Sequence, residues 1–272
     1  MRSPKRPYLP LIAAAMGSAL AGSVVTTGTA HAEVDTLRVG VTPGPHAEIM
    51  EVVAEVAADD GLTIEILEFS DYVVPNTALA DGDLDLNSFQ HEPYLDNQVR
   101  DRGFDLVSVA PTVVFPMGFY SETYTSMDEV PEGAKIAIQN DPTNGGRSLL
   151  LLQSAGLLTL GDGTGLTPSI LDITENPRNF QFIELDAAQL PRSLSDVDVA
   201  SVNTNYAVEA GLDPNDDAIL REGQDSPYMN IIAVRAEDAD AAWLDRFVAA
   251  YHSDRVRQFV DERFEGAVVA GF

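Results

Sequence analysis

A strand–helix–strand pattern between residues 37 and 67 constrains the fold more than any other feature of the chain. Residues 37–41 and 62–67 alternate as strands do, whereas apolar residues recur at helical spacing over residues 46–58. Gly61 marks the end of that helix. Two strands joined by a helix of this length pair in parallel, so the pattern predicts an α/β fold.

The second half of the chain repeats this plan. Residues 135–138 are predicted to form a strand, residues 141–146 a tight loop, and residues 147–153 a helix that stops near Gly156. A later strand is predicted near residues 182–185. A chain of 272 residues is long enough for two lobes of ordinary size, so we expect two similar α/β lobes.

A shorter repeat places polar and aromatic residues at the ends of two strands. The segments ALADGDLDL (78–86) and RSLSDVDVA (192–200) each read as a helix end, an acidic turn and a short strand. The first is followed by Phe-Gln-His at residues 89–91, and the second by Asn-Thr-Asn-Tyr at residues 203–206. Open α/β sheets bind ligands beyond the carboxyl ends of their strands, so we expect a ligand cleft between the lobes.

Two extended runs flank the second half, at residues 113–115 and 230–234, and are predicted to cross between the lobes. Lobe I is therefore expected to comprise residues 33–113 with residues 231–272 returning to it. Lobe II is expected to comprise residues 114–230. The returning segment is predicted to be helical from Asp238 to Phe264 and to pack on lobe I through Trp243, Phe247, Val248, Tyr251, Val256 and Phe259.

The first 32 residues are predicted to be a secretory signal peptide. Three basic residues precede an apolar run over residues 9–25, and Ala-His-Ala at residues 30–32 has the small-x-small pattern of a cleavage site. We expect cleavage before Glu33, since the alternative of an uncleaved anchor requires a longer, unbroken apolar run. Residues 20–23, LAGS, resemble the box that precedes a lipidated cysteine, but Ser23 cannot form the thioether. The protein is therefore expected to be exported, periplasmic or at the cell surface, and not lipidated at a cysteine.

The composition excludes several classes of function. The chain has 43 acidic and 16 basic residues and a formal charge of −27, which is unsuited to nucleic acid. It has no cysteine, which excludes disulfides, thiolate catalysis and cysteine-ligated zinc. A surface this acidic stays hydrated at high salt, so we expect a halophilic source, with incidental acidity as the alternative.

His91 and Arg147 are the residues with the most specific chemistry. His91 is followed by possible metal ligands, but the histidines after residue 32 are isolated from one another, and a packing role is more usual for such a histidine. No hydrolase, P-loop or zincin motif supports an enzyme. Arg147 is predicted to lie in the first turn of a helix, where the N–H groups and a guanidinium together suit a carboxylate. An arginine merely exposed on that turn is the alternative.

Four segments together resemble a known family. They are DYVVPNTALADGDLDLNSFQHEPYLDNQ (71–98), NDPTNGGRSLLLLQSAGLL (140–158), LPRSLSDVDVASVNTNYA (190–207) and SPYMN (226–230). In this order they resemble the methionine-binding (NlpA/MetQ-type) lipoproteins, which are substrate-binding components of methionine ABC importers. The resemblance runs from about residue 37 to the C-terminus.

The resemblance implies a two-lobed periplasmic-binding-protein fold (type II) that closes on L-methionine and delivers it to a membrane permease and its ATPase. We also expect a monomer with no enzymatic activity, cofactor or metal. The residues that match the family's ligand site are Tyr72, Phe89, His91 and Tyr94 for the side chain, Arg147 for the carboxylate, and Asn203 and Asn230 for the backbone polar groups. The chain departs from the family in lacking the lipid cysteine and in Gly145–Gly146, which is expected to loosen the loop before Arg147.

The physical chemistry of these residues agrees with an amino-acid ligand. A carboxylate suits Arg147, amide oxygens accept from an ammonium group without adding charge, and sulfur packs well at aromatic edges. Another apolar amino acid or a small methionine-containing peptide remains an alternative ligand. A metal-binding protein is a third and weaker alternative.

Overall fold

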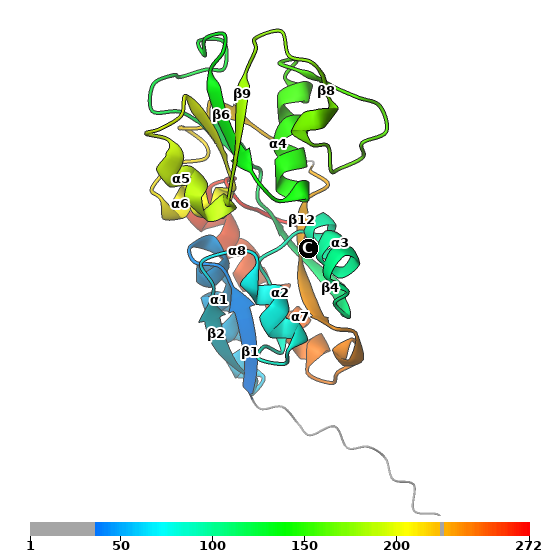
Figure 1. Cartoon of the computed structure of the whole chain (residues 1–272). Coiled ribbons are helices and arrows are strands. Elements are labelled where there is room, and N and C mark those ends of the chain that lie inside the picture. The colour runs from blue at the N-terminus through cyan, green and yellow to red at the C-terminus, as the bar shows by residue number, and fades with distance from the viewer. Residues whose placement is uncertain (1–35, 224–225) are drawn as a thin grey trace, which may run out of the picture. The chain divides into compact units, whose positions relative to one another are not determined.

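The computed structural model describes residues 36–223 and 226–272 (Figure 1). The predicted signal peptide, its cleavage site and Ser23 lie outside the described residues. None of the helices in the described ranges has both the length and the apolarity needed to cross a membrane. The described chain is built on two main sheets, which confirms the predicted α/β class.

The first sheet has six strands in the order β13-β4-β12-β3-β1-β2. Strands β1 and β2 pair in parallel through six residues each, and α1 connects them as the sequence predicts. Strand β12 is antiparallel to its neighbours β3 and β4. The elements of this part are β1 (Thr36–Val41), α1 (Pro45–Asp59), β2 (Thr63–Glu68), α2 (Val74–Ala80), β3 (Leu86–Asn87), α3 (Glu92–Arg102), β4 (Leu106–Val114), β12 (Met229–Arg235), α7 (Leu244–Tyr251), α8 (Asp254–Phe264) and β13 (Val269–Ala270).

The second sheet has five strands in the order β11-β5-β10-β6-β9. Strand β6 pairs in parallel with both β9 and β10, and β5 is antiparallel to β10 and β11. A separate two-stranded sheet, β7 with β8, lies beyond α4 in the chain. The elements are β5 (Gly118–Tyr120), β6 (Lys135–Gln139), α4 (Pro142–Ser154), β7 (Thr159–Leu160), β8 (Ile173–Glu175), β9 (Gln181–Leu185), α5 (Leu190–Ser193), β10 (Val199–Val202), α6 (Thr204–Glu209) and β11 (Leu220–Arg221).

Two connections join the sheets, and both are displaced from the predicted crossings. The first runs from the end of β4 to the start of β5, so only Phe115 of the predicted crossing at residues 113–115 lies in it, and residues 113–114 are the end of β4. The second runs from the end of β11 to the start of β12. Residues 230–234, expected to cross, instead lie inside β12 and pair with β4 and β3, because this apolar run is buried between two strands.

The C-terminal segment forms two helices rather than one. Helix α7 ends at Tyr251, and the side chain of Ser253 accepts a hydrogen bond from the Val256 N–H and begins α8. A serine at this position competes with helix continuation, which explains the break. Trp243, Phe247, Tyr251 and Val256 are buried as predicted, whereas Val248 and Phe259 are half-buried at the rim.

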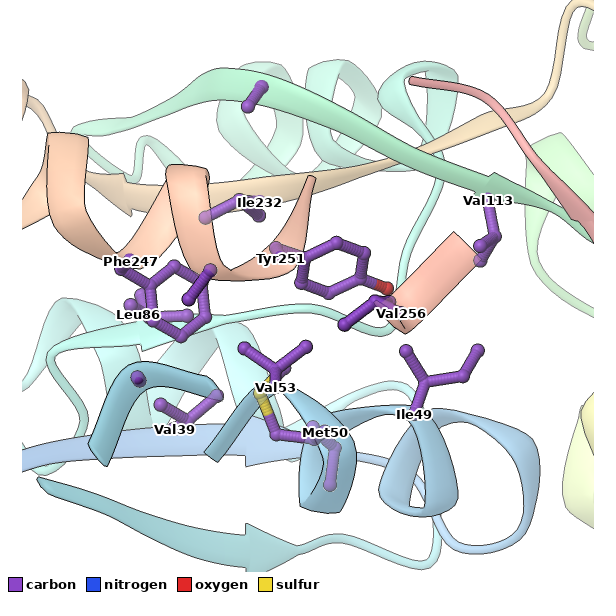
Figure 2. Close-up of a cluster of buried hydrophobic side chains, with 14 of the residues drawn as sticks. Val39, Ile49, Met50, Val53, Leu86, Val113, Ile232, Phe247, Tyr251 and Val256 are labelled. Carbon is purple, nitrogen blue, oxygen red and sulfur yellow. The ribbon is translucent and has the colours of Figure 1, made fainter. Parts of the chain in front are cut away.

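The main apolar core lies between the six-stranded sheet and helices α1, α7 and α8 (Figure 2). Helix α1 contributes Ile49, Met50 and Val53, and the sheet contributes Val39, Leu86, Val113 and Ile232. The C-terminal helices close this core with Phe247, Tyr251 and Val256. The core therefore fixes strand β3, whose carboxyl end carries the candidate ligand residues Phe89 and His91, and its parallel neighbour β1.

Candidate functional site

One cavity, with about 330 Å³ of empty space when its opening to solvent is included, gathers all seven sequence-predicted site residues. Phe89 and His91 follow β3, and Asn203 follows β10, so the carboxyl ends of strands from both sheets face the cavity as the sequence predicts. The other predicted members are Tyr72, Tyr94, Arg147 and Asn230. Five further lining residues were not predicted from the sequence: His46, Gln90, Phe115, Asn144 and Asn205.

Three aromatic rings form an apolar wall. The centroids of Tyr72 and Phe89 are 5.9 Å apart, and Tyr94 meets both rings edge-on at 6.2 Å. The Tyr72 hydroxyl donates to Asn205 Oδ1 at 2.6 Å, and the Tyr94 hydroxyl donates to the Tyr72 carbonyl at 2.9 Å. Burial raises the pKa of both hydroxyls, so they stay protonated. Because the hydroxyls are bound within the protein, the wall offers ring surface to a ligand.

His91 is a neutral residue that caps α3. The Tyr94 backbone N–H donates to its Nδ1 at 3.1 Å, so the ring proton lies on Nε2 and is donated to Asn144 Oδ1 at 3.2 Å. Burial, and then the nearby charge of Arg147, lower the pKa of His91 to about 3. Both ring nitrogens are thus engaged, and no group of three or more potential metal ligands occurs among residues 36–223 and 226–272.

His46 orients the side-chain amide of Asn230. Asn230 Nδ2 donates to His46 Nε2 at 2.9 Å, so the other ring nitrogen carries the proton and donates to Thr42 Oγ1 at 2.8 Å. Burial lowers the pKa of His46 to about 3, which keeps the ring neutral and able to accept. The remaining polar atom of the amide, Asn230 Oδ1, is therefore available to accept a hydrogen bond. His46 could have been found from its position just after β1, which runs parallel to β3.

A chain of amides fixes the orientation of Asn203. Asn144 Nδ2 donates to the carboxylate of Asp141 at 2.9 and 3.1 Å, which turns Asn144 Oδ1 toward Asn203 Nδ2 at 2.9 Å. Gln139 Nε2 donates to Asn203 Oδ1 at 2.8 Å. Asn203 therefore has one amide N–H left for a ligand. Because the Asp141 carboxylate can only accept, the donor and acceptor atoms of Asn144 and Asn203 are fixed along this series of hydrogen bonds.

Arg147 lies deeper in its helix than the sequence analysis predicts. Helix α4 begins at Pro142, and the N-cap Asp141 accepts from the N–H groups of Thr143 and Asn144 at 3.2 and 2.8 Å. The stretch 141–146 predicted as a loop is thus mostly helix, and Arg147 is in its second turn. The helix N-terminus is satisfied by Asp141, so it adds no N–H groups to a ligand site.

The guanidinium of Arg147 is already held by the protein on one edge. Its Nε and Nη2 donate to the two carboxylate oxygens of Glu222 at 2.8 and 2.5 Å, and Nη2 also donates to the Phe115 carbonyl at 2.8 Å. The Cζ atom of Arg147 lies over the ring of Tyr228, 4.3 Å from its centroid. Only 3% of Arg147 is exposed, which rules out the alternative of a surface arginine. Its Nη1 has no hydrogen-bond partner among the described residues.

The glycine pair before Arg147 allows close packing rather than a loose loop. A Cβ on Gly145 would lie 2.6 Å from the carbonyl oxygen of Gln139, and one on Gly146 would lie 2.9 Å from the carbonyl oxygen of Leu166. Both contacts are with backbone, which cannot move aside cheaply. The pair therefore lets α4 approach its neighbours and places Arg147 at the cavity.

The family profile described as NlpA lipoprotein matches residues 37–272. The chain belongs to the NlpA lipoprotein family. Among curated relatives, this NlpA-family chain is 48% identical over 264 residues to the D-methionine-binding lipoprotein MetQ of Salmonella typhimurium, an alignment that covers 95% of this chain and 97% of the relative. It is 47% identical to the protein of the same name from Escherichia coli, with the same coverage.

Solved structures agree with the family assignment. A nutrient-binding protein from Burkholderia cenocepacia, bound to methionine, is 50% identical with a TM-score of 0.85, and the match covers 87% of this chain and all of the other. A structure of the methionine-binding protein MetQ is 47% identical with a TM-score of 0.86 over 88% of this NlpA-family chain and 99% of the other. These matches confirm the predicted binding-protein fold.

Proposed function

We propose that this protein binds methionine in the cavity between its sheets and acts as the substrate-binding component of an ABC importer. The observation that carries the proposal is one cavity that joins an oriented arginine, two oriented asparagines and an aromatic wall. The high identity to proteins named for methionine binding, one of them solved with methionine, supports it. A permease and an ATPase are the partners that such a component requires.

The hydrogen-bond directions support different roles for the residues of the proposed site. The ligand carboxylate is placed at Arg147 Nη1 and at the remaining N–H of Asn203, because both are donors. The ligand ammonium is placed at Asn230 Oδ1, which His46 keeps directed as an acceptor. Asn203 therefore binds the carboxylate rather than the ammonium. The thioether lies against Tyr72, Phe89 and Tyr94.

We also propose that residues 33–113 with 231–272 and residues 114–230 form two lobes that close on the ligand. Contacts across the cavity support this mechanism. Tyr72 bonds to Asn205, and His91 bonds to Asn144, in each case from the six-stranded to the five-stranded side. A ligand that binds residues of both lobes favours the closed arrangement by its differential affinity for it.

Competition against labelled L-methionine tests the ligand. Selenomethionine is expected to bind about as well as methionine, and norleucine within roughly tenfold, because replacing sulfur by CH₂ loses only the sulfur–aromatic contribution of ~0.3–1.5 kcal/mol. Leucine is expected to bind far more weakly, since its branch meets the ring wall, and glutamate to fail because its carboxylate would lose water without gaining a partner. Both methionine enantiomers belong in the assay, since curated relatives are named for D-methionine.

The competition assay also separates the alternative ligands. If leucine matches methionine, the site is a general apolar amino-acid site. If a methionine-containing dipeptide displaces label better than methionine does, the cavity opens further at the ligand's amino end than the proposal requires. Absence of binding by any amino acid would overturn the proposal.

We propose that the protein is exported and released from its signal peptide without a lipid anchor. The Ala-His-Ala pattern at residues 30–32 and Ser23 at the lipidation position support this. We expect the exported protein to begin at Glu33. Its intact mass is the measurement: an added diacylglyceryl mass, or residues retained before Glu33, would contradict the proposal.

A further inference from the structure

Glu222 is held rigidly behind the proposed ligand site. Its backbone N–H donates to the Met117 carbonyl at 3.0 Å, and its Oε2 accepts from the Met117 N–H at 3.1 Å. The backbone and the side chain of Glu222 are therefore both bound to the backbone of Met117. Its side chain is 12% exposed and forms the two-point pair with Arg147. Glu222 does not line the cavity, so it acts on a ligand through Arg147 and through its charge.

Glu222 neutralises the one cation that lines the cavity. Arg147 is the one cation among the residues that line the cavity, and the lining includes no carboxylate. The two lining histidines are neutral, because burial lowers the pKa of each to about 3. Asp141, which bonds to Asn144, lies against the N–H groups that begin α4, so the positive potential there offsets part of its charge. The rest of that charge reaches the lining, where burial and then Asp141 raise the pKa of Tyr94. Arg147 and Glu222 together therefore form a pair without net charge, and no uncompensated cation remains in the lining.

We infer that Glu222 selects for ligands without net charge, and so for α-amino acids over the corresponding α-hydroxy and α-keto acids. The inference rests on the proposed function and deepens it. A zwitterion brings a carboxylate and an ammonium group and leaves the site neutral. A hydroxy acid brings the same carboxylate and side chain but a net negative charge, which the buried carboxylate of Glu222 repels. Without Glu222, Arg147 would attract any carboxylic acid of suitable shape.

The test compares two ligands of nearly the same shape. L-Methionine and its hydroxy analogue, 2-hydroxy-4-(methylthio)butanoate, are titrated by calorimetry into the wild type and into Glu222→Gln, which is similar in size but uncharged. Removing one charge inside a protein changes the binding of another charge several ångströms away by about tenfold or more. We therefore expect the preference for methionine over the hydroxy analogue to fall about tenfold in Glu222→Gln.

Two further variants separate charge from structure. Glu222→Asp disturbs the two-point geometry but keeps the charge, so its preference is expected to stay within a few-fold of the wild type even if both affinities fall. Glu237→Gln removes an acid whose side chain is 80% exposed and should change nothing. A purely structural role for Glu222 would weaken both ligands together in Glu222→Gln and leave their ratio unchanged.

The outcomes are distinguishable from those for the proposed function. If the wild type fails to bind methionine, the proposed function is wrong. Suppose that the wild type binds methionine, but the preference for methionine over the hydroxy analogue falls less than fivefold in Glu222→Gln. The inference about Glu222 is then overturned and the proposed function stands. The same conclusion follows if the preference falls as far in Glu222→Asp as in Glu222→Gln. A fall of fivefold or more, seen in Glu222→Gln and absent from Glu222→Asp, supports it.

Discussion

Arg147→Ala is expected to reduce methionine affinity by about 30-fold to several thousand-fold. A charge-assisted pair with a carboxylate in a buried site contributes ~2–5 kcal/mol when one partner is removed, and each 1.4 kcal/mol is about tenfold in affinity. Arg147 is the only cation in the lining of the cavity, so no neighbouring side chain there can replace it. Isothermal titration calorimetry with L-methionine measures the loss.

The Arg147 variant needs a control, because alanine also leaves Glu222 buried without its partner. An unpaired buried charge is costly, and the single variant is therefore expected to be less stable. The double variant Arg147→Met with Glu222→Gln removes both charges and keeps the volume. We expect its circular dichroism to match the wild type while methionine binding stays lost. Near-wild-type affinity in the double variant would show that the ligand carboxylate does not bind at Arg147.

The parts of the site that the sequence predicts best are those set by strand ends. Phe89 and His91 follow β3, and Asn203 follows β10, so the rule that ligands bind beyond the carboxyl ends of parallel strands places them correctly in one cavity. The same rule applied to β1 would have added His46. The repeat between residues 78–86 and 192–200 is therefore the most informative local signal in the chain.

The sequence predicts less where tertiary packing overrides local preference. Two glycines in a row suggested a loop before Arg147, but Asp141 and Pro142 are the N-cap and first residue of α4. These helical positions are occupied by glycine because the backbone of Gln139 and Leu166 leaves no space for a Cβ there. Glu222 gave no signal at all, since it is one of 43 acidic residues and meets Arg147 only through the fold.

Phe247→Ala is expected to lower the free energy of unfolding by about 3–5 kcal/mol, since removing a fully buried phenylalanine loses its transfer free energy and leaves a cavity. Phe247 is completely buried in the core between α1, α7 and the six-stranded sheet, which fixes strands β1 and β3 (Figure 2). Domains of this class are stable by only about 5–15 kcal/mol, so the loss is a large fraction of the total. Urea unfolding, followed by circular dichroism and by the fluorescence of Trp243 in the same core, measures it.

Phe259→Ala provides the matched control for this core. It removes the same side chain from the next helix, but Phe259 is half-buried and packs at the rim of the cluster, so we expect less than half the cost. Neither residue lines the cavity, and methionine at a fixed excess over its Kd should therefore stabilise both variants by the same increment as the wild type. Equal losses in the two variants would show that α7 does not close the core. A smaller methionine increment in Phe247→Ala alone would show that this core also sets the geometry of the strand ends at the cavity.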